Sequence, residues 1–167
     1  MREVPVVSSA LRTVELPREE DTLAFGRRLG ALLQAGDLVL LDGPLGAGKT
    51  VLTRGIAAGM GVTGAVTSPT FVIARVHRPD VADRPALVHV DAYRLGGLEE
   101  IDDLDLDTDL TESAVVVEWG SGMAEQLADS FLAVRLQRRP DDVRELTLEP
   151  HGERWEQRVV ELVEQFE

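Results

Sequence analysis

The octapeptide at residues 43–50 limits the possible folds more than any other part of the chain. It reads Gly-Pro-Leu-Gly-Ala-Gly-Lys-Thr and matches the pattern G-x-x-x-x-G-K-[ST] at every fixed position. The apolar run Leu38–Leu41 precedes it, which is typical of a strand buried on both faces, and a helix is expected to begin at Lys49. Gly46 and Gly48 let the backbone between them curl, so that successive N–H groups point inward at phosphate oxygens. The pattern therefore predicts a strand, a phosphate-binding loop and a helix.

Lysine use along the chain supports this interpretation. Sixteen of the seventeen basic residues are arginine, and the one lysine is Lys49. A compact ammonium on a flexible stem suits this position, where it would reach the β and γ phosphates of a nucleotide while the hydroxyl of Thr50 would bind Mg²⁺. Nucleotide contacts are expected from Gly43, Leu45, Gly46, Ala47, Gly48, Lys49, Thr50 and Val51.

The base of the nucleotide is constrained by what the chain lacks. GTPases select guanine with an Asn-Lys-x-Asp motif, but this chain contains no asparagine. The residues from Asp91 to Arg94 also do not supply the D-x-x-G switch that such proteins use. ATP with Mg²⁺ is therefore the expected cofactor pair.

Two carboxylates stand directly after apolar strands. Asp91 follows Leu87–Val90, and Glu118 follows Ala114–Val117. Because the carboxyl ends of neighbouring parallel strands meet at one edge of a sheet, both are expected beside the loop. One would hold Mg²⁺ directly or through water, and the other would orient or deprotonate the attacking water. The sequence leaves open which does which, and the alternative for either residue alone is a solvent-facing cap. The expected catalytic residues are Lys49, Asp91 and Glu118, and the expected metal ligands are Thr50, Glu118 and Asp91.

Other residues near these strands are weaker candidates. Ser68 and Thr70 belong to a hydroxyl-rich loop of the kind that senses a γ-phosphate, and the alternative is a plain turn. Trp119 follows Glu118 and would either stack on a ligand or fill the rim of the core. His89 alternates with core valines, which favours a structural strand histidine over a catalyst.

The order of elements predicts an α/β fold. Helical spacing is expected over residues 17–35, 49–60, 123–128 and 155–166, and apolar strands over 13–16, 38–41, 71–76, 87–90 and 114–117. Alternating residues on either side of Arg139–Asp142 predict a terminal β-hairpin. The expected architecture is a three-layer sandwich of the P-loop type with a mixed, mostly parallel central sheet, then a hairpin and a helix. The 167 residues favour one domain over the whole chain.

Composition narrows the functional classes. A formal net charge of −13 excludes binding to nucleic acid through bulk electrostatics. The arginines of residues 135–144 are expected to be a solvated hairpin face, with a local basic strip as the alternative. There is no cysteine and no apolar run long enough to span a bilayer, and a cytoplasmic protein is expected.

Several further blocks carry a family resemblance that covers most of the chain. Together they resemble the bacterial tRNA threonylcarbamoyladenosine biosynthesis ATPase family, TsaE. The P-loop alone is generic, whereas the S-P-T-F, H-x-D-x-Y-R-L and V-E-W blocks at these spacings are specific. The blocks are Gly36–Leu41, Gly43–Thr50, Arg54–Ile56, Thr67–Phe71, His89–Leu95 and Val117–Trp119.

The resemblance implies weak intrinsic ATPase activity that partner proteins stimulate. It implies a complex that installs threonylcarbamoyl on the adenosine next to the tRNA anticodon, in which the ATPase resets the transferase between turnovers. The implied partners are the transferase subunit and its paralogous dimerisation partner, with tRNA reached only through them and no membrane. The resemblance also implies roles for single residues. Lys49 would bind phosphate, Thr50 and Glu118 would bind magnesium, and Asp91 would take the Walker B-like position. Ser68–Phe71 would form a switch-like loop, and Trp119 would lie beside the metal-binding glutamate.

Three departures from the family pattern affect residues around the site rather than its ligands. Pro44 stands where an acidic residue is common, Ala92 where a larger apolar residue is common, and Gly120 where proline is frequent.

The alternative function is a P-loop kinase for a small metabolite. Such a kinase needs an acceptor pocket and usually an arginine-bearing lid, and a β-hairpin such as residues 135–144 is not a typical lid.

Overall fold

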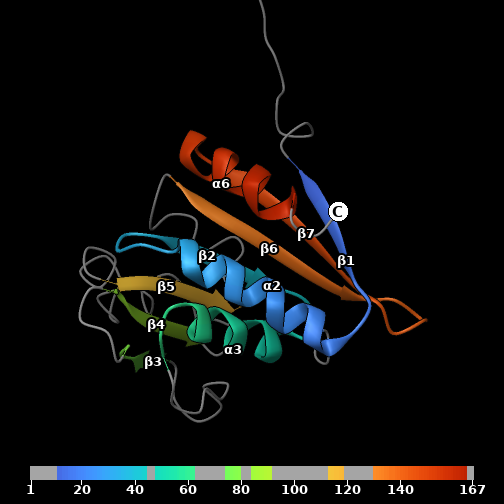
Figure 1. Ribbon diagram of the computed structural model, residues 1–167, viewed down its shortest axis with the longest axis horizontal. Coiled ribbons are helices and arrows are strands. Elements are labelled where there is room, and N and C mark those ends of the chain that lie inside the picture. Colours follow the sequence, from blue (N-terminus) through green and yellow to red (C-terminus); the bar gives the residue numbers. More distant parts are fainter. Residues whose placement is uncertain are drawn as a thin grey trace, which may run out of the picture.

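Seven strands form one sheet in the computed structural model, which describes residues 11–44, 48–62, 74–79, 84–91, 113–118 and 130–164. The strands are β1 (Arg12–Leu16), β2 (Leu38–Asp42), β3 (Ala74–His77), β4 (Ala86–Asp91), β5 (Ser113–Glu118), β6 (Phe131–Arg138) and β7 (Arg144–His151). Their order across the sheet is β1-β7-β6-β2-β5-β4-β3 (Figure 1). The four middle strands, β6, β2, β5 and β4, run parallel, and the outer strands pair antiparallel. The loop-bearing strand β2 therefore lies at the centre of the sheet.

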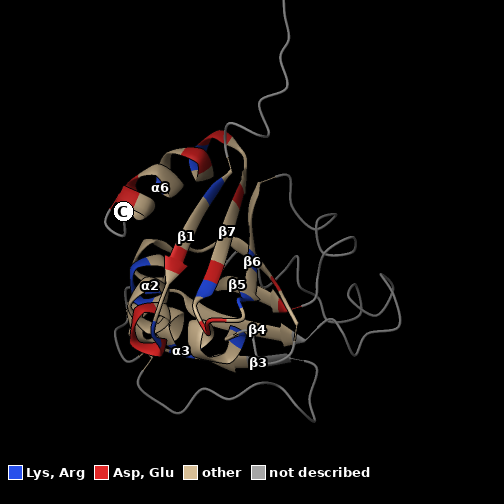
Figure 2. Cartoon of the chain, turned by 90° about the vertical axis from the view of Figure 1, so that its right-hand side faces the viewer, with Lys and Arg blue, Asp and Glu red and all other residues tan. Residues whose placement is uncertain are grey.

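Three helices are described, and they lie on the same side of the sheet (Figure 2). They are α2 (Glu19–Leu32), α3 (Lys49–Gly59) and α6 (Glu153–Glu164). Their apolar faces share one buried cluster with every second residue of the middle strands, for example Val39 and Leu41 of β2. This periodicity defines a helix-covered face of the sheet and an opposite face. None of the described helices is long and apolar enough to cross a membrane.

Helices α2 and α3 approach so closely that glycine is required at the contact. A Cβ atom on Gly30 would lie 2.1 Å from the carbonyl oxygen of Ile56, and one on Gly59 would lie 2.2 Å from that of Arg27. Gly26 and Gly55 have equally short approaches to the backbone of the facing helix. Because these distances are far below van der Waals contact, four glycines at four-residue spacing fix how the helix that follows the loop sits against its neighbour.

A buried ion pair holds the last helix against the start of β2. Asp37 is 2% exposed, and its carboxylate lies 2.8 Å from Arg158 and 3.1 Å from Arg154, both on α6. The same carboxylate accepts a hydrogen bond of 2.6 Å from the backbone N–H of Gln34. Asp37 therefore links the turn before β2 to a helix that is distant in sequence.

The predicted mixed, mostly parallel sheet and the C-terminal hairpin and helix are confirmed. The first helix, α2, is shorter than the predicted range of residues 17–35, because the backbones of Arg18 and Leu33 are extended. The carboxylate of Asp21 accepts the Arg18 N–H at 3.0 Å and so marks the helix start. The short helix expected over residues 123–128 lies outside the described residues.

Candidate active site at the carboxyl edge of the sheet

The loop after β2 leaves the sheet where the geometry requires glycine. Gly43 has φ +151, and a Cβ atom there would lie 2.5 Å from the carbonyl oxygen of Leu136 on β6. Gly48 has φ +109 and directly precedes α3. Only glycine adopts such backbone angles easily, so the backbone conformation explains why glycine stands at both fixed glycine positions of the motif.

Lys49 begins α3 and turns back into the loop. It is 6% exposed, and its Nζ donates a hydrogen bond of 2.5 Å to the carbonyl oxygen of Gly43. The ammonium therefore lies between the first glycine of the loop and the N-terminal end of α3. The N-terminal end of a helix carries partial positive charge, which attracts anions. Thr50 and Val51, the next residues of α3, are half-buried at the same end.

The two predicted carboxylates end neighbouring strands, as expected. Glu118 pairs in register with Asp91 of β4 on one side and with Leu41 of β2 on the other. All three strands are parallel, so their carboxyl ends meet at the edge of the sheet from which the loop leaves. Glu118 is the nearer of the two to β2, because β5 is the direct neighbour of that strand and β4 is one strand further away. The side chain of Asp91 lies outside what the structure describes.

Glu118 is held by a residue whose role the sequence did not reveal. His89 Nε2 forms a hydrogen bond with Glu118 Oε2, and the two side chains are 1% and 8% exposed. His89 pairs with Val116, and Glu118 lies two residues further along β5, so both side chains project to the helix-covered face. Since the carboxylate only accepts, Nε2 carries the donated proton, and Nδ1 has no hydrogen-bond partner among the described residues. The prediction of a structural strand histidine was incomplete, because its partner is the candidate metal ligand.

These residues fit a magnesium ion that is bound mainly through phosphates. Mg²⁺ in nucleotide sites usually takes one or two carboxylates together with waters and phosphate oxygens. Glu118 supplies a buried carboxylate, and Thr50 supplies a hydroxyl at the start of α3. Among the described residues there is no cluster of three or more potential metal ligands. One carboxylate and one hydroxyl suit a metal whose other ligands are phosphate oxygens and waters.

An arginine from the terminal hairpin also reaches this edge. Arg144 is the first residue of β7, and its Nε would lie 3.5 Å from a Cβ atom on Gly48. The sequence placed this arginine with others on a solvated hairpin face. Arg138 and Arg139 fit that description, because they pair with the exposed carboxylates of Asp142, Asp141 and Glu15. Alternation with Leu146 and Leu148 places Arg144 on the helix-covered face, but alternation with Val134 and Leu136 places Arg138 there too, so this pattern does not single out Arg144.

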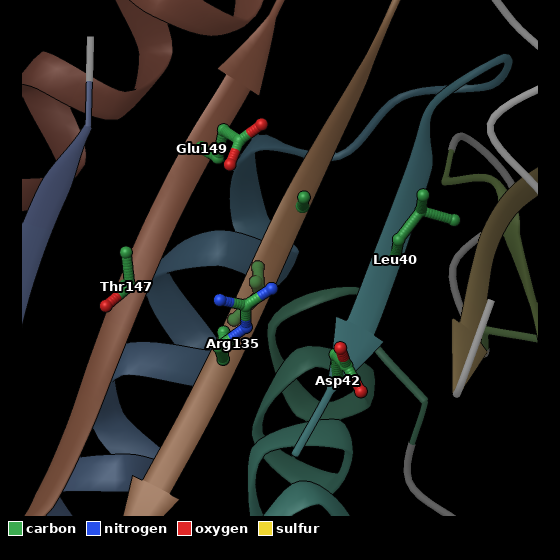
Figure 3. A pocket seen from close by; sticks show the side chains of 7 residues that line it. Leu40, Asp42, Arg135, Thr147 and Glu149 are labelled. Atoms are coloured by element: carbon green, nitrogen blue, oxygen red, sulfur yellow. The ribbon is translucent and has the colours of Figure 1, made fainter. Parts of the chain in front are cut away.

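A hollow lies on the face of the sheet opposite the described helices. Arg135 on β6 projects between Asp42 of β2 and Thr147 and Glu149 of β7 (Figure 3). The adjoining hollow continues past Asp42 to Gly43 and Pro44, the start of the loop. The surface beside the loop therefore includes a polar patch on the face that α3 does not cover.

The remaining predicted site residues cannot be placed. They are Leu45, Gly46 and Ala47 of the loop, Ser68 and Thr70 of the hydroxyl-rich segment, and Trp119, all outside the described residues.

Comparisons with known proteins agree with the geometry. The family model described as threonylcarbamoyl adenosine biosynthesis protein TsaE matches residues 16–146. A Streptomyces coelicolor protein named tRNA threonylcarbamoyladenosine biosynthesis protein TsaE is 61% identical over 136 residues, which cover 78% of this chain and 91% of the relative. The Bacillus subtilis protein of the same name is 39% identical over 144 residues, covering 86% and 88%.

A solved structure gives the same result for the fold. The crystal structure of Bacillus subtilis YdiB superposes with a TM-score of 0.75 at 32% identity and covers 93% of this chain and 95% of that one. The family match extends from the end of β1, through the loop and both carboxylate strands, into β7. By sequence and by fold, the chain belongs to the TsaE family.

Proposed function

We propose that this protein is a Mg²⁺-dependent ATPase that serves the biosynthesis of threonylcarbamoyladenosine in tRNA. The match to the TsaE family over residues 16–146 carries the proposal. It contains the full phosphate-binding motif and both strand-end carboxylates. The two relatives described above, both named for this pathway, share 61% and 39% identity with the chain over most of its length.

The chemistry begins with capture of the phosphates. The ammonium of Lys49 lies 2.5 Å from the Gly43 carbonyl oxygen, at the positive N-terminal end of α3. The combined positive charge of the ammonium and the helix end suits a polyphosphate, whose negative charges spread over several oxygens. Lys49 would exchange its bond with the Gly43 carbonyl for bonds with β- and γ-phosphate oxygens. Binding and orientation of ATP would thus come mainly from this loop and helix.

Strands β5 and β4 would supply the carboxylates that face the metal. When bound, Mg²⁺ neutralises charge that develops on the β and γ phosphates. Glu118 and Thr50 would hold it, with Asp91 either in its coordination sphere or directed at the attacking water. His89 keeps one oxygen of Glu118 in a fixed hydrogen bond, which limits the rotation of the carboxylate. We assign low intrinsic turnover and stimulation by partners, in keeping with the family.

The proposed role in the pathway is to reset a transferase complex between turnovers rather than to transfer the threonylcarbamoyl group. The proposed partners are the transferase subunit and its paralogous dimerisation partner. The acidity of this chain, with a net charge of −13, suits contact with tRNA only through those partners. ATP hydrolysis at the loop would supply the free energy for the reset.

The experiment is multiple-turnover formation of threonylcarbamoyladenosine on tRNA. Transferase components and threonylcarbamoyl-adenylate are supplied with wild-type protein, with the Lys49→Ala variant or with neither. We expect repeated turnover with the wild type only, and at most one turnover per complex otherwise. Equal product with and without the wild-type protein would contradict the pathway role. A screen of small-molecule phosphate acceptors would then test the alternative of a metabolite kinase.

A further inference from the structure

Arg144 occupies a position on β7 that brings it to the edge of the sheet where the phosphate loop begins. β7 runs antiparallel to β6, so its first residue lies beside the last residues of the parallel strands. In register, Arg144 pairs with Arg138 of β6 and with Leu16 of β1. Leu146, two residues further on, is buried against the helices, so Arg144 projects to the face that α3 covers.

The guanidinium of Arg144 reaches the junction of the loop and α3. Its Nε would lie 3.5 Å from a Cβ atom on Gly48, the residue that directly precedes the first turn of α3. Lys49 begins that turn and is buried. Two cationic side chains from distant parts of the sequence therefore flank the positive end of one helix dipole. This is an unfavourable arrangement unless an anion joins it.

Arg144 differs from its neighbours in its partners. Arg138 donates two hydrogen bonds to the Asp142 carboxylate, at 3.0 and 2.7 Å, and this interaction lowers the pKa of Asp142 below its ordinary value. Arg139 pairs with the carboxylates of Glu15 and Asp141. Arg144 instead donates through Nη1 to the backbone carbonyl of Asp142, at 2.9 Å. Among the described residues Arg144 forms no ion pair within hydrogen-bond distance, although its charge also contributes to the lowered pKa of the nearby Asp142 carboxylate.

We propose that Arg144 is a second cationic ligand for the phosphates of the nucleotide. The inference rests on the proposed ATP site and adds a residue from outside the loop. The bond to the Asp142 carbonyl would keep the side chain extended toward Gly48 and leave other N–H groups of the guanidinium for phosphate oxygens. A guanidinium presents several donors in one plane, which suits such oxygens.

The strand order indicates which side of the phosphates Arg144 meets. β7 and β6 lie on one side of β2, whereas β5 and β4, which carry Glu118 and Asp91, lie on the other. Mg²⁺ would be held on the side of Glu118, whereas Arg144 lies beside Gly48, in the loop whose N–H groups would cradle the α and β phosphates. Arg144 would therefore contact oxygens of the phosphates that ADP and ATP share. It strengthens binding of both nucleotides, with or without Mg²⁺.

The test is equilibrium binding of ATP and of ADP, by calorimetry, with and without Mg²⁺. Arg144→Gln removes the charge, and Arg138→Gln is the matched control because it removes the same charge from the same hairpin. We expect Arg144→Gln to raise Kd for both nucleotides about 10- to 100-fold, the usual loss for a charge-assisted hydrogen bond. Arg138→Gln should change Kd less than about twofold, since exposed ion pairs contribute little. Arg144→Lys keeps the charge without the planar donors and should fall between wild type and Arg144→Gln.

The outcomes separate this inference from the proposal on which it rests. Equal Kd values for Arg144→Gln and Arg138→Gln, with Lys49→Ala strongly impaired, would overturn the role of Arg144 alone. An unimpaired Lys49→Ala variant would overturn the ATP site itself. A loss for ATP without a loss for ADP would overturn the assignment to shared phosphate oxygens. Thermal unfolding of the nucleotide-free variants reports on folding, and a purely structural arginine would lower the melting temperature while leaving Kd unchanged.

Discussion

His89 and Glu118 form a buried hydrogen-bonded pair across β4 and β5, at the edge of the sheet where the phosphate loop begins. Through this hydrogen bond, buried His89 of β4 holds Glu118, the candidate metal ligand. A buried carboxylate without a donor is costly, and one with a single donor is restricted in orientation. His89 therefore determines both the stability of this edge and the direction in which the Glu118 carboxylate faces.

Substitutions at His89 should separate these effects. His89→Phe removes the donor and should lower the free energy of unfolding by about 1–3 kcal/mol, because it leaves a buried carboxylate unsatisfied. It should also weaken Mg²⁺-dependent ATP binding. His89→Gln can place an amide N–H near the position of Nε2, so it should retain most of both properties. Urea unfolding and Mg²⁺ titrations in the presence of ATP would measure them, and equal behaviour of the two variants would contradict the donor role.

Glu118 itself is tested by an isosteric change. Glu118→Gln keeps the volume of the side chain but removes the negative charge that would face Mg²⁺. We expect ATP binding to lose most of its dependence on Mg²⁺ while binding without the metal persists. Asp91→Asn is the matched variant on the neighbouring strand. A normal Mg²⁺ dependence in Glu118→Gln together with its loss in Asp91→Asn would transfer the metal role to Asp91.

The contact between α2 and α3 predicts a reversal of the usual helix propensity. Replacing glycine by alanine inside a helix normally stabilises it by about 1 kcal/mol. At Gly30 the added Cβ would lie 2.1 Å from the Ile56 carbonyl oxygen, so the helices would have to move apart. Gly30→Ala should therefore destabilise the protein by about 1–3 kcal/mol or more. A higher urea midpoint for Gly30→Ala would show that the helices separate without cost.

The ion pair at the start of β2 should matter more than any exposed pair. Asp37 is 2% exposed and contacts Arg158, whose side chain is 13% exposed. Asp37→Ala leaves that arginine unpaired and should cost about 3 kcal/mol. Arg154→Gln is the control: that side chain is 51% exposed and should cost less than about 1 kcal/mol. Chemical denaturation compares them, and equal losses would contradict a dominant contribution from burial.

Much of the fold follows from local patterns in the sequence. The apolar run before Gly43, the alternation in the hairpin and the spacing of Trp155 and Val159 predict their elements because each depends on short-range periodicity. The position of Asp91 and Glu118 at one edge of the sheet was also predictable, since parallel strands bring their carboxyl ends together. These inferences needed no knowledge of which strand pairs with which.

The unpredicted features depend on long-range pairing. The bond between His89 and Glu118 requires β4 to lie beside β5 in one particular register. The position of Arg144 requires the hairpin to lie on the far side of β2 from those strands. The glycines of α2 and α3 look like poor helix residues until the two helices are seen to cross at that contact. Each of these relationships joins segments that are distant in sequence, so local patterns alone do not reveal it.

The most direct test of the account is the threonylcarbamoyladenosine content of tRNA in living cells. A bacterial strain depleted of its own TsaE-family protein would express wild-type protein, Lys49→Ala or the surface control Arg138→Gln, and digested tRNA would be quantified by mass spectrometry. The account predicts normal modification with the wild type and with Arg138→Gln, and a loss close to that of the depleted strain with Lys49→Ala. Full modification with Lys49→Ala, at matched protein levels, would contradict the claim that nucleotide binding at this loop drives the function.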